Sequence, residues 1–258
     1  MKRLIARTIS ECCAVGRSFS GPRRGYRVLL YHAVGSRLAH DPYGISIDPA
    51  LFERHIAALA SDPRVRVVPF ATHAETEAPI SLAITFDDGY KDTLATAAPI
   101  LLKHRLPFTV FVTCAFLSRR SLDYLTVPEL RELAALPGVS IGSHGATHVP
   151  LATCEDAELQ HELEGSRREL EGLLGRPVTS IAYPHGSVDR RVREAASRAG
   201  YVTGACSRFD INRPGQDPLL LCRTEIVARD SERVFLQKLA GAWDWLRWRR
   251  GACVGLPT

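Results

Sequence analysis

The chain contains the stretch Leu82-Ala83-Ile84-Thr85-Phe86-Asp87-Asp88-Gly89, in which a short apolar, β-branched run ends in two acidic residues and a glycine. Similar short runs recur along the sequence, and segments with helical periodicity lie between them. Strands that alternate with helices in this way are typical of parallel sheets with crossover helices. The sequence therefore predicts an α/β fold, either a barrel or a doubly wound sheet.

This pattern predicts a series of short strands and intervening helices. The helix near residue 50 has a clear start, because Asp48 is a good capping residue and Pro49 suits the first helical turn. No Gly-x-Gly-x-x-Gly motif follows the first strand, so nothing favours a dinucleotide-binding sheet. The predicted strands are 27–31, 66–68, 82–86, 109–113, 139–142, 180–182, 201–206 and 219–227, and the helices lie near 50–60, 91–104, 127–136, 156–174 and 188–199.

The composition is that of a globular protein large enough to bury a core. The 258 residues are 45% hydrophobic and 24% charged, which argues against a disordered or fibrous chain. The net charge of +5 is small, and basic residues cluster only near the C-terminal end, so nucleic acid is not an expected partner. No apolar run approaches the roughly 18–20 residues that a membrane-spanning helix requires.

Cysteine usage favours a reducing compartment. The seven cysteines include no Cys-x-x-Cys motif, and Cys114, Cys206 and Cys222 lie in apolar, strand-like runs, as free buried thiols do. Residues 1–25 form a short lead-in whose apolar stretch is broken by Arg7, so it falls short of a signal-peptide core. We therefore expect a cytoplasmic location, with peripheral contact at the inner face of the membrane and export as open alternatives.

The C-terminal segment, residues 229–258, has the pattern of one amphipathic, Trp/Arg-rich helix. Its apolar positions recur at helical spacing and give one face that can dock on the barrel. A second interpretation is peripheral membrane contact, because tryptophan and arginine suit the headgroup layer. The apolar face comprises Phe235, Leu239, Ala242 and Leu246, and the segment also holds Trp243, Trp245, Trp248, Arg249 and Arg250.

Four polar clusters directly follow predicted strands, and this placement predicts one site. In α/β barrels, the C-terminal ends of the strands and the loops after them carry the chemistry. We therefore expect the clusters to converge on one mouth. They are Tyr31-His32, Asp87-Asp88-Gly89, Ser143-His144 and Tyr183-Pro184-His185-Gly186.

The residue types in these clusters suit a divalent metal. Taken alone, Asp87-Asp88-Gly89 also fits a surface turn, and His144 and His148 also fit two solvated loop histidines. Together, one carboxylate and two imidazoles form a three-ligand set that leaves a position open for water, as in catalytic zinc sites. One aspartate would bind the metal, and the other would remain free as a base.

The motifs resemble those of the polysaccharide deacetylases with NodB homology, carbohydrate esterase family 4, because Thr-Phe-Asp-Asp-Gly, Ser-His-x-x-x-His and Tyr-Pro-x-Gly occur in that order. The resemblance covers roughly residues 26–228 and implies a single domain, a distorted (β/α) barrel. It implies that Asp87 is the general base and that the metal ligands are Asp88, His144 and His148. Zinc is the expected metal, with cobalt or nickel as alternatives.

Two departures from the family pattern shape the expected site. No histidine follows His185, so the general acid is assigned to His32, as in the circularly permuted branch that includes the poly-N-acetylglucosamine deacetylases. Ala182 stands where most members have an arginine that holds the base, and Arg223 on another predicted strand is the candidate substitute.

His185 replaces an aromatic residue of the family motif. The resemblance implies that its backbone N–H stabilises the oxyanion, a role that does not depend on the side chain. The side chain itself is an additional acid, a substrate contact or a bystander. Other substrate contacts are expected from Tyr31, Tyr183, Pro184 and Arg223.

The resemblance thus implies a metal-dependent hydrolase that removes the N-acetyl group from an amino sugar in a polysaccharide or a lipid-linked glycan. A metal-bound water attacks, Asp87 takes its proton, and His32 protonates the departing amine. A deformylase or an O-acetyl esterase using the same site is one alternative. A catalytically silent barrel that binds carbohydrate is another, although the presence of a full ligand set and a base argues against it.

Overall fold

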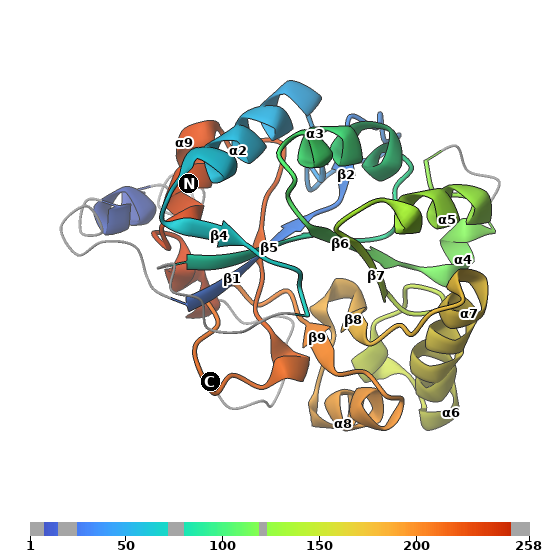
Figure 1. Cartoon of the computed structure of the whole chain (residues 1–258). Helices are drawn as coiled ribbons and strands as arrows, with labels where there is room; N and C mark the ends of the chain where they lie inside the picture. The colour runs from blue at the N-terminus through green and yellow to red at the C-terminus, as the bar shows by residue number, and fades with distance from the viewer. Residues whose placement is uncertain (1–7, 15–24, 72–79, 119–122, 249–258) are drawn as a thin grey trace.

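The computed structural model describes residues 8–14, 25–71, 80–118 and 123–248. Its main sheet is parallel, and Figure 1 shows it curled at the centre with helices around the outside. The predicted α/β fold, a distorted barrel, is confirmed. The strands of this sheet are β1 (Gly25–Tyr31), β4 (Val65–Val67), β5 (Ile80–Phe86), β6 (Phe108–Val112), β7 (Val139–Ser143), β8 (Ser180–Ala182), β9 (Thr203–Ala205) and β10 (Thr224–Glu225).

The sheet has the order β10-β1-β5-β6-β7-β8-β9, and β4 pairs with the start of β5. A bridge between Ala205 and Leu221 links the end of β9 to the segment that leads into β10. β10 in turn pairs with β1, with Leu29 opposite Thr224. Residues 221–225 therefore close the barrel between its last and first strands. A separate pair of short strands, β2 (Ala33–Val34) and β3 (Ser46–Ile47), follows β1.

Helices are present at all five places near which the periodicity predicts them between residues 50 and 199, and α4 is an additional short helix. α2 begins with the expected cap, because the Asp48 side chain accepts a hydrogen bond from the N–H of Leu51. Two of the predicted helices contain a π-helical turn, at Thr93–Ala97 and at His161–Gly165. The α-helices are α2 (Pro49–Ser61), α3 (Ala98–Lys103), α4 (Cys114–Leu117), α5 (Val127–Ala135), α6 (Asp156–Gln160), α7 (Ser166–Leu174), α8 (Arg190–Arg198) and α9 (Glu232–Leu239).

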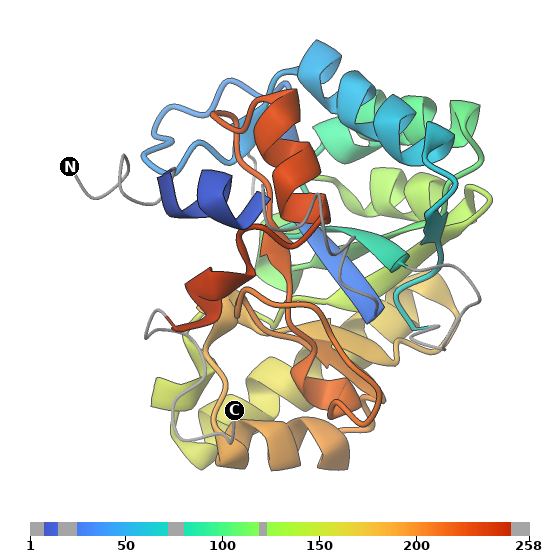
Figure 2. The same ribbon diagram turned by 90° about the vertical axis from the view of Figure 1, so that its left-hand side faces the viewer.

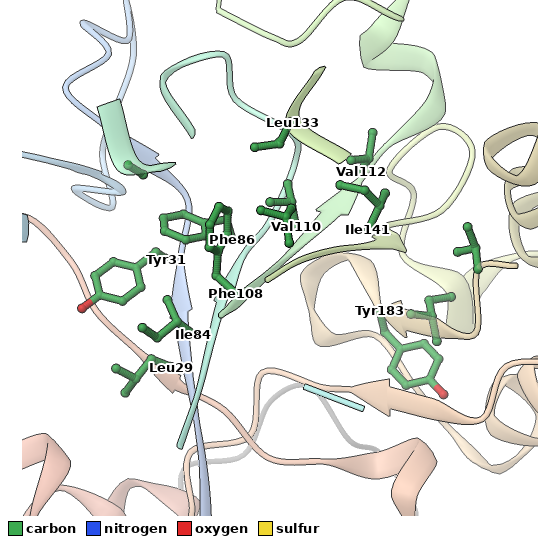
Figure 3. Close-up of a cluster of buried hydrophobic side chains, with 14 of the residues drawn as sticks. Leu29, Tyr31, Ile84, Phe86, Phe108, Val110, Val112, Leu133, Ile141 and Tyr183 are labelled. Carbon is green, nitrogen blue, oxygen red and sulfur yellow. The ribbon is translucent and has the colours of Figure 1, made fainter. Parts of the chain in front are cut away.

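The core lies between the sheet and these helices. Every residue of β5 is buried, as expected for a central strand covered on both faces. Figure 3 shows Tyr31, Phe86 and Phe108 close together in this core, and the ring centroids of Tyr31 and Phe86 are 5.6 Å apart. This packing fixes the strands whose C-terminal ends carry the polar clusters.

The predicted strand at 219–227 is wrong over most of its length. Pro218–Leu220 is instead a 3-10 turn, because the Asp217 side chain accepts a hydrogen bond from the N–H of Leu219. The side chain of Asn212 then takes both the N–H and the C=O of Cys222 away from any strand ladder. Only Thr224–Glu225 pairs as a strand.

The single C-terminal helix predicted over 229–258 is also wrong, because α9 ends at Leu239. Gly241 then takes a left-handed conformation, with φ +84°, and a 3-10 turn follows at Asp244–Trp248. This break brings Asp244 to Arg27, and the two make a buried bidentate ion pair at 3.0 Å. Residues 249–258, including Arg249 and Arg250, lie outside the described residues.

The segment around α9 docks on the fold and on the helix of residues 8–14, which lies beside it in Figure 2. The indole N–H of Trp245 donates to Ser10 Oγ at 3.0 Å, and that of Trp243 donates to Gln237 Oε1. Docking supports the first interpretation of this segment, and membrane contact stays a prediction. In the part of the chain that the structure describes, no helix is both long enough and apolar enough to cross a membrane.

The predicted free thiols are confirmed for the described cysteines. Cys114, Cys206 and Cys222 are buried and unbridged, as is Cys154. Cys253 lies outside the described residues. The division of the chain at residues 25 and 228 stays a prediction, although the Arg27–Asp244 pair ties the C-terminal segment to β1.

Candidate metal centre and active site

Asp87 and Asp88 lie where β5 ends, and the backbone there turns both side chains toward one place. The N–H of Asp87 still donates to the carbonyl of Tyr31 on β1 at 3.0 Å. Asp88 and Gly89 then have φ values of +73° and +81°. Two successive left-handed residues reverse the chain sharply, so neighbouring carboxylates that would diverge along a strand both approach His144.

His144 follows β7 and is held in a defined tautomer. Its Nδ1 lies 2.7 Å from the carbonyl oxygen of Ala182, which only accepts, so Nδ1 carries the proton and Nε2 presents a lone pair. This Nε2 lies 3.4 Å from Asp88 Oδ1 and 3.7 Å from Asp87 Oδ2. Burial lowers the pKa of His144 to about 4, so the ring is neutral at neutral pH.

His148 completes the cluster from the loop after β7. Its Nε2 lies 3.2 Å from Asp88 Oδ1, and its ring centroid is 4.9 Å from that of His144. One ligand atom from each of Asp88, His144 and His148 lies within 4.8 Å of the other two. The three residues that the family resemblance assigns to the metal are thus brought together.

This set of donors fits a divalent cation. Asp88 Oδ1 is buried, and the Nε2 atoms of both histidines face it, that of His148 at 3.2 Å and that of His144 at 3.4 Å. Hydrogen bonding and charge from the neighbouring histidines lower the pKa of Asp88 against the opposing effect of burial, so the carboxylate is ionised. One carboxylate and two imidazoles are the ligands that zinc and related transition metals prefer.

Asp87 is held by Arg223 and not by the metal cluster. The guanidinium donates two parallel hydrogen bonds to the carboxylate, at 2.6 and 2.7 Å, and its Nε donates to the carbonyl of Cys206. Burial opposes ionisation, but Arg223 and then His144 lower the pKa of Asp87 below its ordinary value. Asp87 is therefore an ionised carboxylate in a fixed orientation next to the metal ligands.

His32 lies at the end of β1 on the same side of the sheet. Its Nδ1 is buried and has no hydrogen-bond partner among the described residues. His32 directly follows β1, whose last residue, Tyr31, lies opposite Phe86 at the end of β5, so His32 and the Asp87-Asp88 pair lie at neighbouring strand ends.

His185 packs edge-on against His148, with ring centroids 4.5 Å apart. Its Nε2 lies 3.3 Å from the carbonyl oxygen of His148. Burial first and the neighbouring His148 second lower the pKa of His185. The side chain thus lies at the rim of the cluster, against one of its metal-ligand candidates.

The four residues expected to contact substrate are all buried, which argues against direct substrate contact by their side chains. Tyr31 and Tyr183 are fully buried, and Tyr183 donates its hydroxyl hydrogen to the carbonyl of Leu219. Arg223 is only 1% exposed and is occupied by Asp87. Pro184 is buried as well. These side chains are buried beneath the surface of the site, and none of them is exposed to a ligand.

Left-handed backbone gathers at this site in a way that the sequence does not reveal. Among the described residues, the non-glycine positions with positive φ are Asp88, Arg105, His148 and His185. Such conformations are costly outside glycine, and they cluster at functional sites where the surrounding structure holds them. Two of the four, Asp88 and His148, lie in the cluster, and a third, His185, lies at its rim.

Sequence analysis also missed Glu162, a buried acid whose carboxylate accepts hydrogen bonds from the loop between His144 and His148. A signal existed. Leu159, Leu163 and Ser166 mark the inward face of the predicted helix, and Glu162 is on that face, where an acid is unexpected.

The fold and the site together define a class of protein: a curled parallel α/β barrel with an Asp-His-His set at its strand ends and a clamped second aspartate beside it. The family model for polysaccharide deacetylase matches residues 74–204, just over half of the chain. The chain belongs to the polysaccharide deacetylase family.

Relatives and a solved structure agree with this assignment. YxkH, a polysaccharide deacetylase homologue of Bacillus subtilis (strain 168), is 26% identical over 182 residues, which cover 69% of this chain and 62% of YxkH. Chitooligosaccharide deacetylase of Bradyrhizobium sp. (strain ANU 289) is 26% identical over 144 residues, which cover 54% of this chain and 63% of that protein. This chain thus spans less than two thirds of the length of either relative.

The structure of Streptococcus pyogenes deacetylase PplD in complex with acetate shares the fold. The two chains superpose with a TM-score of 0.74 at 23% sequence identity, over 84% of this chain and 99% of PplD. Family membership and the curled barrel are therefore consistent with each other.

Proposed function

We propose that this protein is a metal-dependent deacetylase that hydrolyses the N-acetyl group of an amino sugar in a glycan. The observation that carries the proposal is the pairing of two aspartates with different surroundings at the end of β5. Asp88 faces two imidazoles, whereas Asp87 is bound by Arg223. One carboxylate is thus suited to hold a cation and the other to accept a proton.

Asp88, His144 and His148 would hold the cation, with zinc as the expected metal and cobalt or nickel as alternatives. When bound at three protein ligands, such an ion lowers the pKa of a coordinated water to about 7 and polarises an acyl carbonyl. Because His144 is neutral and Asp88 is ionised, both are already in the protonation state that a metal requires.

Asp87 is assigned as the general base. Arg223 fixes its orientation through both guanidinium nitrogens and keeps it ionised, so it can accept a proton from the attacking water. A base with a pKa held this low is weak, but its fixed position near the ligands compensates, because positioned acid–base groups contribute about 10²–10⁴-fold.

His32 is assigned as the general acid that protonates the departing amine. The assignment is supported by its place at the end of β1, beside the strand end that carries both carboxylates, and by its buried Nδ1 that lacks a partner. The backbone N–H of His185 is assigned to the developing oxyanion, and its side chain at the rim to a substrate contact.

The substrate class follows from the family and from one relative. The relative from Bradyrhizobium is named as a chitooligosaccharide deacetylase, so N-acetylglucosamine oligomers are the first compounds to test. A lipid-linked amino sugar is the second. Formylated and O-acetylated sugars test whether the same site prefers another acyl group.

Acetate release from N-acetylglucosamine oligomers tests the proposal. The protein is stripped with a chelator and re-supplied with Zn²⁺, Co²⁺ or Ni²⁺. We expect release to vanish on stripping, to return with metal, and to be lost in His144→Ala. The matched control is His161→Ala, which removes an exposed imidazole outside the cluster and should retain full activity.

Three other outcomes would contradict the proposal in different ways. Metal binding without release from any acetylated sugar favours a carbohydrate-binding barrel. Release of formate, or of acetate from O-acetyl groups alone, favours the rival hydrolases. Release that survives complete removal of metal would reject the metal-dependent mechanism.

A further inference from the structure

We infer that Glu162 is a positioning residue for the candidate metal centre: its carboxylate holds the loop between His144 and His148 so that both imidazoles face Asp88. The inference rests on the proposed metal site. Glu162 is 1% exposed and lies in the continuous helical segment formed by α6, the π turn and α7, about 15 residues after the loop.

The carboxylate is occupied entirely by the loop. Oε2 accepts hydrogen bonds from the N–H groups of Ala146 and Thr147, at 2.8 and 3.1 Å. Oε1 accepts from the N–H of Thr147 at 3.1 Å and from its hydroxyl at 2.5 Å. Two consecutive backbone amides and one side chain are thus bound by a single acid, midway between the two histidines.

Glu162 lies within the π-helical turn at His161–Gly165. A π turn inserts a residue into the helix and changes which side chains face inward. The carbonyls that the turn displaces are bound by side chains: Ser166 Oγ donates to Glu162 at 2.6 Å, and the Tyr201 hydroxyl donates to Leu163 at 3.0 Å. Hydrogen bonds from Ser166 and Tyr201 therefore stabilise the π turn.

The loop lies directly against the carboxylate. A Cβ added at Gly145 would meet Glu162 Oε2 at 2.8 Å and Pro184 Cγ at 3.3 Å. Gly145 also has a φ of +78°. The loop can approach Glu162 this closely only because this position has no side chain.

Glu162 does not belong to the ligand set, whose members are Asp88, His144 and His148. Its oxygens are used by donors on the loop, so its effect on a metal passes through the loop that carries the ligands. Residues of this kind, which orient ligands from outside, typically change metal affinity by about 10–100-fold when removed.

The test compares Glu162→Gln with Glu164→Gln, the same chemical change two residues along the same π turn. The Glu164 carboxylate instead binds Gln160 and Arg168, on its own helix. Metal-free protein is titrated with Co²⁺ alone, and affinity is measured by competition with a chelator. The absorption spectrum of bound Co²⁺ reports the ligand geometry, and the melting temperature of the metal-free protein reports the fold.

We expect Glu162→Gln to bind Co²⁺ about 10–100-fold more weakly, with a changed spectrum. Glu164→Gln should match the wild-type protein in both. If Glu162→Gln does not fold, a second pair of variants, Thr147→Val and Thr147→Ser, tests the same contact. Valine removes the hydroxyl that donates to Glu162 and should weaken Co²⁺ binding, whereas serine keeps the hydroxyl and should restore it.

Wild-type affinity and an unchanged spectrum in both Glu162→Gln and Thr147→Val would overturn the inference and leave the proposed function intact. A protein that binds Co²⁺ in the expected pattern but releases no acetate would overturn the proposed function and leave this inference standing.

Discussion

Arg223 grips Asp87 through two hydrogen bonds of 2.6 and 2.7 Å, across 136 residues of sequence, with both side chains almost fully buried. Arg223 belongs to the short segment that closes the barrel between Leu221 and β10. The segment that closes the sheet therefore also orients the candidate base, Asp87. A defect in the closing segment should disturb catalysis even where no ligand contact is lost.

Arg223→Lys tests this clamp. Lysine keeps a positive charge but cannot supply the bidentate fork, so the carboxylate of Asp87 loses its fixed orientation. We expect kcat to fall about 10–10²-fold while Co²⁺ affinity stays near the wild-type value, because no metal ligand has changed. Wild-type turnover in Arg223→Lys or in Arg223→Ala would show that the clamp has no part in the reaction.

Asp244→Ala tests the tie between the C-terminal segment and β1. It leaves the guanidinium of Arg27 buried without its carboxylate, which costs about 3–5 kcal/mol in free energy of unfolding. Urea denaturation measures the loss. Glu53→Ala is the matched control, because it breaks an exposed pair with Lys103 that contributes less than about 1 kcal/mol. Equal costs in the two variants would mean that the buried pair does not hold this segment.

His55 predicts a pH dependence of stability. Burial, then Arg54 and Lys238, lower the pKa of His55 to about 4 in the folded protein, from 6.5 for an ordinary histidine. The unfolded chain therefore binds more protons between these values, and stability is retained above pH 6.5 and lost as the pH falls toward 4. Between pH 7 and pH 5, His55 is expected to lower the free energy of unfolding by about 2 kcal/mol.

Urea denaturation of metal-free protein at several pH values measures this contribution. His144 has a similarly lowered pKa, so the informative quantity is the difference between the wild-type protein and His55→Gln. We expect the loss of stability below pH 6.5 to be smaller in the variant by about 2 kcal/mol at pH 5. Identical pH profiles would contradict the assigned cause.

The metal ligands could be predicted from the sequence because their signals are local. Asp88 follows a buried strand, His144 and His148 are four residues apart, and parallel strands bring such ends together at one edge. The parallel α/β architecture follows from the alternation of strands and helices, which needs no long-range information. For these parts the local pattern and the final contact agree.

Other features depend on contacts that no local pattern contains. The run Leu219-Leu220-Leu221-Cys222 looks like a strand, but the Asp217 side chain binds the N–H of Leu219 and the Asn212 side chain binds the backbone of Cys222. The break after α9 serves the pairing of Asp244 with Arg27 across the whole domain. The donors that Glu162 binds lie in the loop between His144 and His148, so the helical pattern alone cannot show what this inward-facing acid contacts.

Substrate contacts were hard to predict for a related reason. Tyr31 and Tyr183 belong to the polar clusters in sequence. However, Tyr31 is the last residue of β1 and Tyr183 directly follows β8, and side chains along a strand alternate between its two faces. Both point into the core and are fully buried. Proximity in sequence to a ligand therefore did not mean proximity to the mouth of the barrel.

The division of labour between the two aspartates is tested most directly by measuring Co²⁺ affinity and acetate release together in Asp87→Asn and Asp88→Asn. We predict that Asp87→Asn binds Co²⁺ with near wild-type affinity and loses acetate release by about 10²–10⁴-fold. Asp88→Asn should lose both. Full acetate release from Asp87→Asn, or loss of metal from Asp87→Asn with retention in Asp88→Asn, would contradict the account.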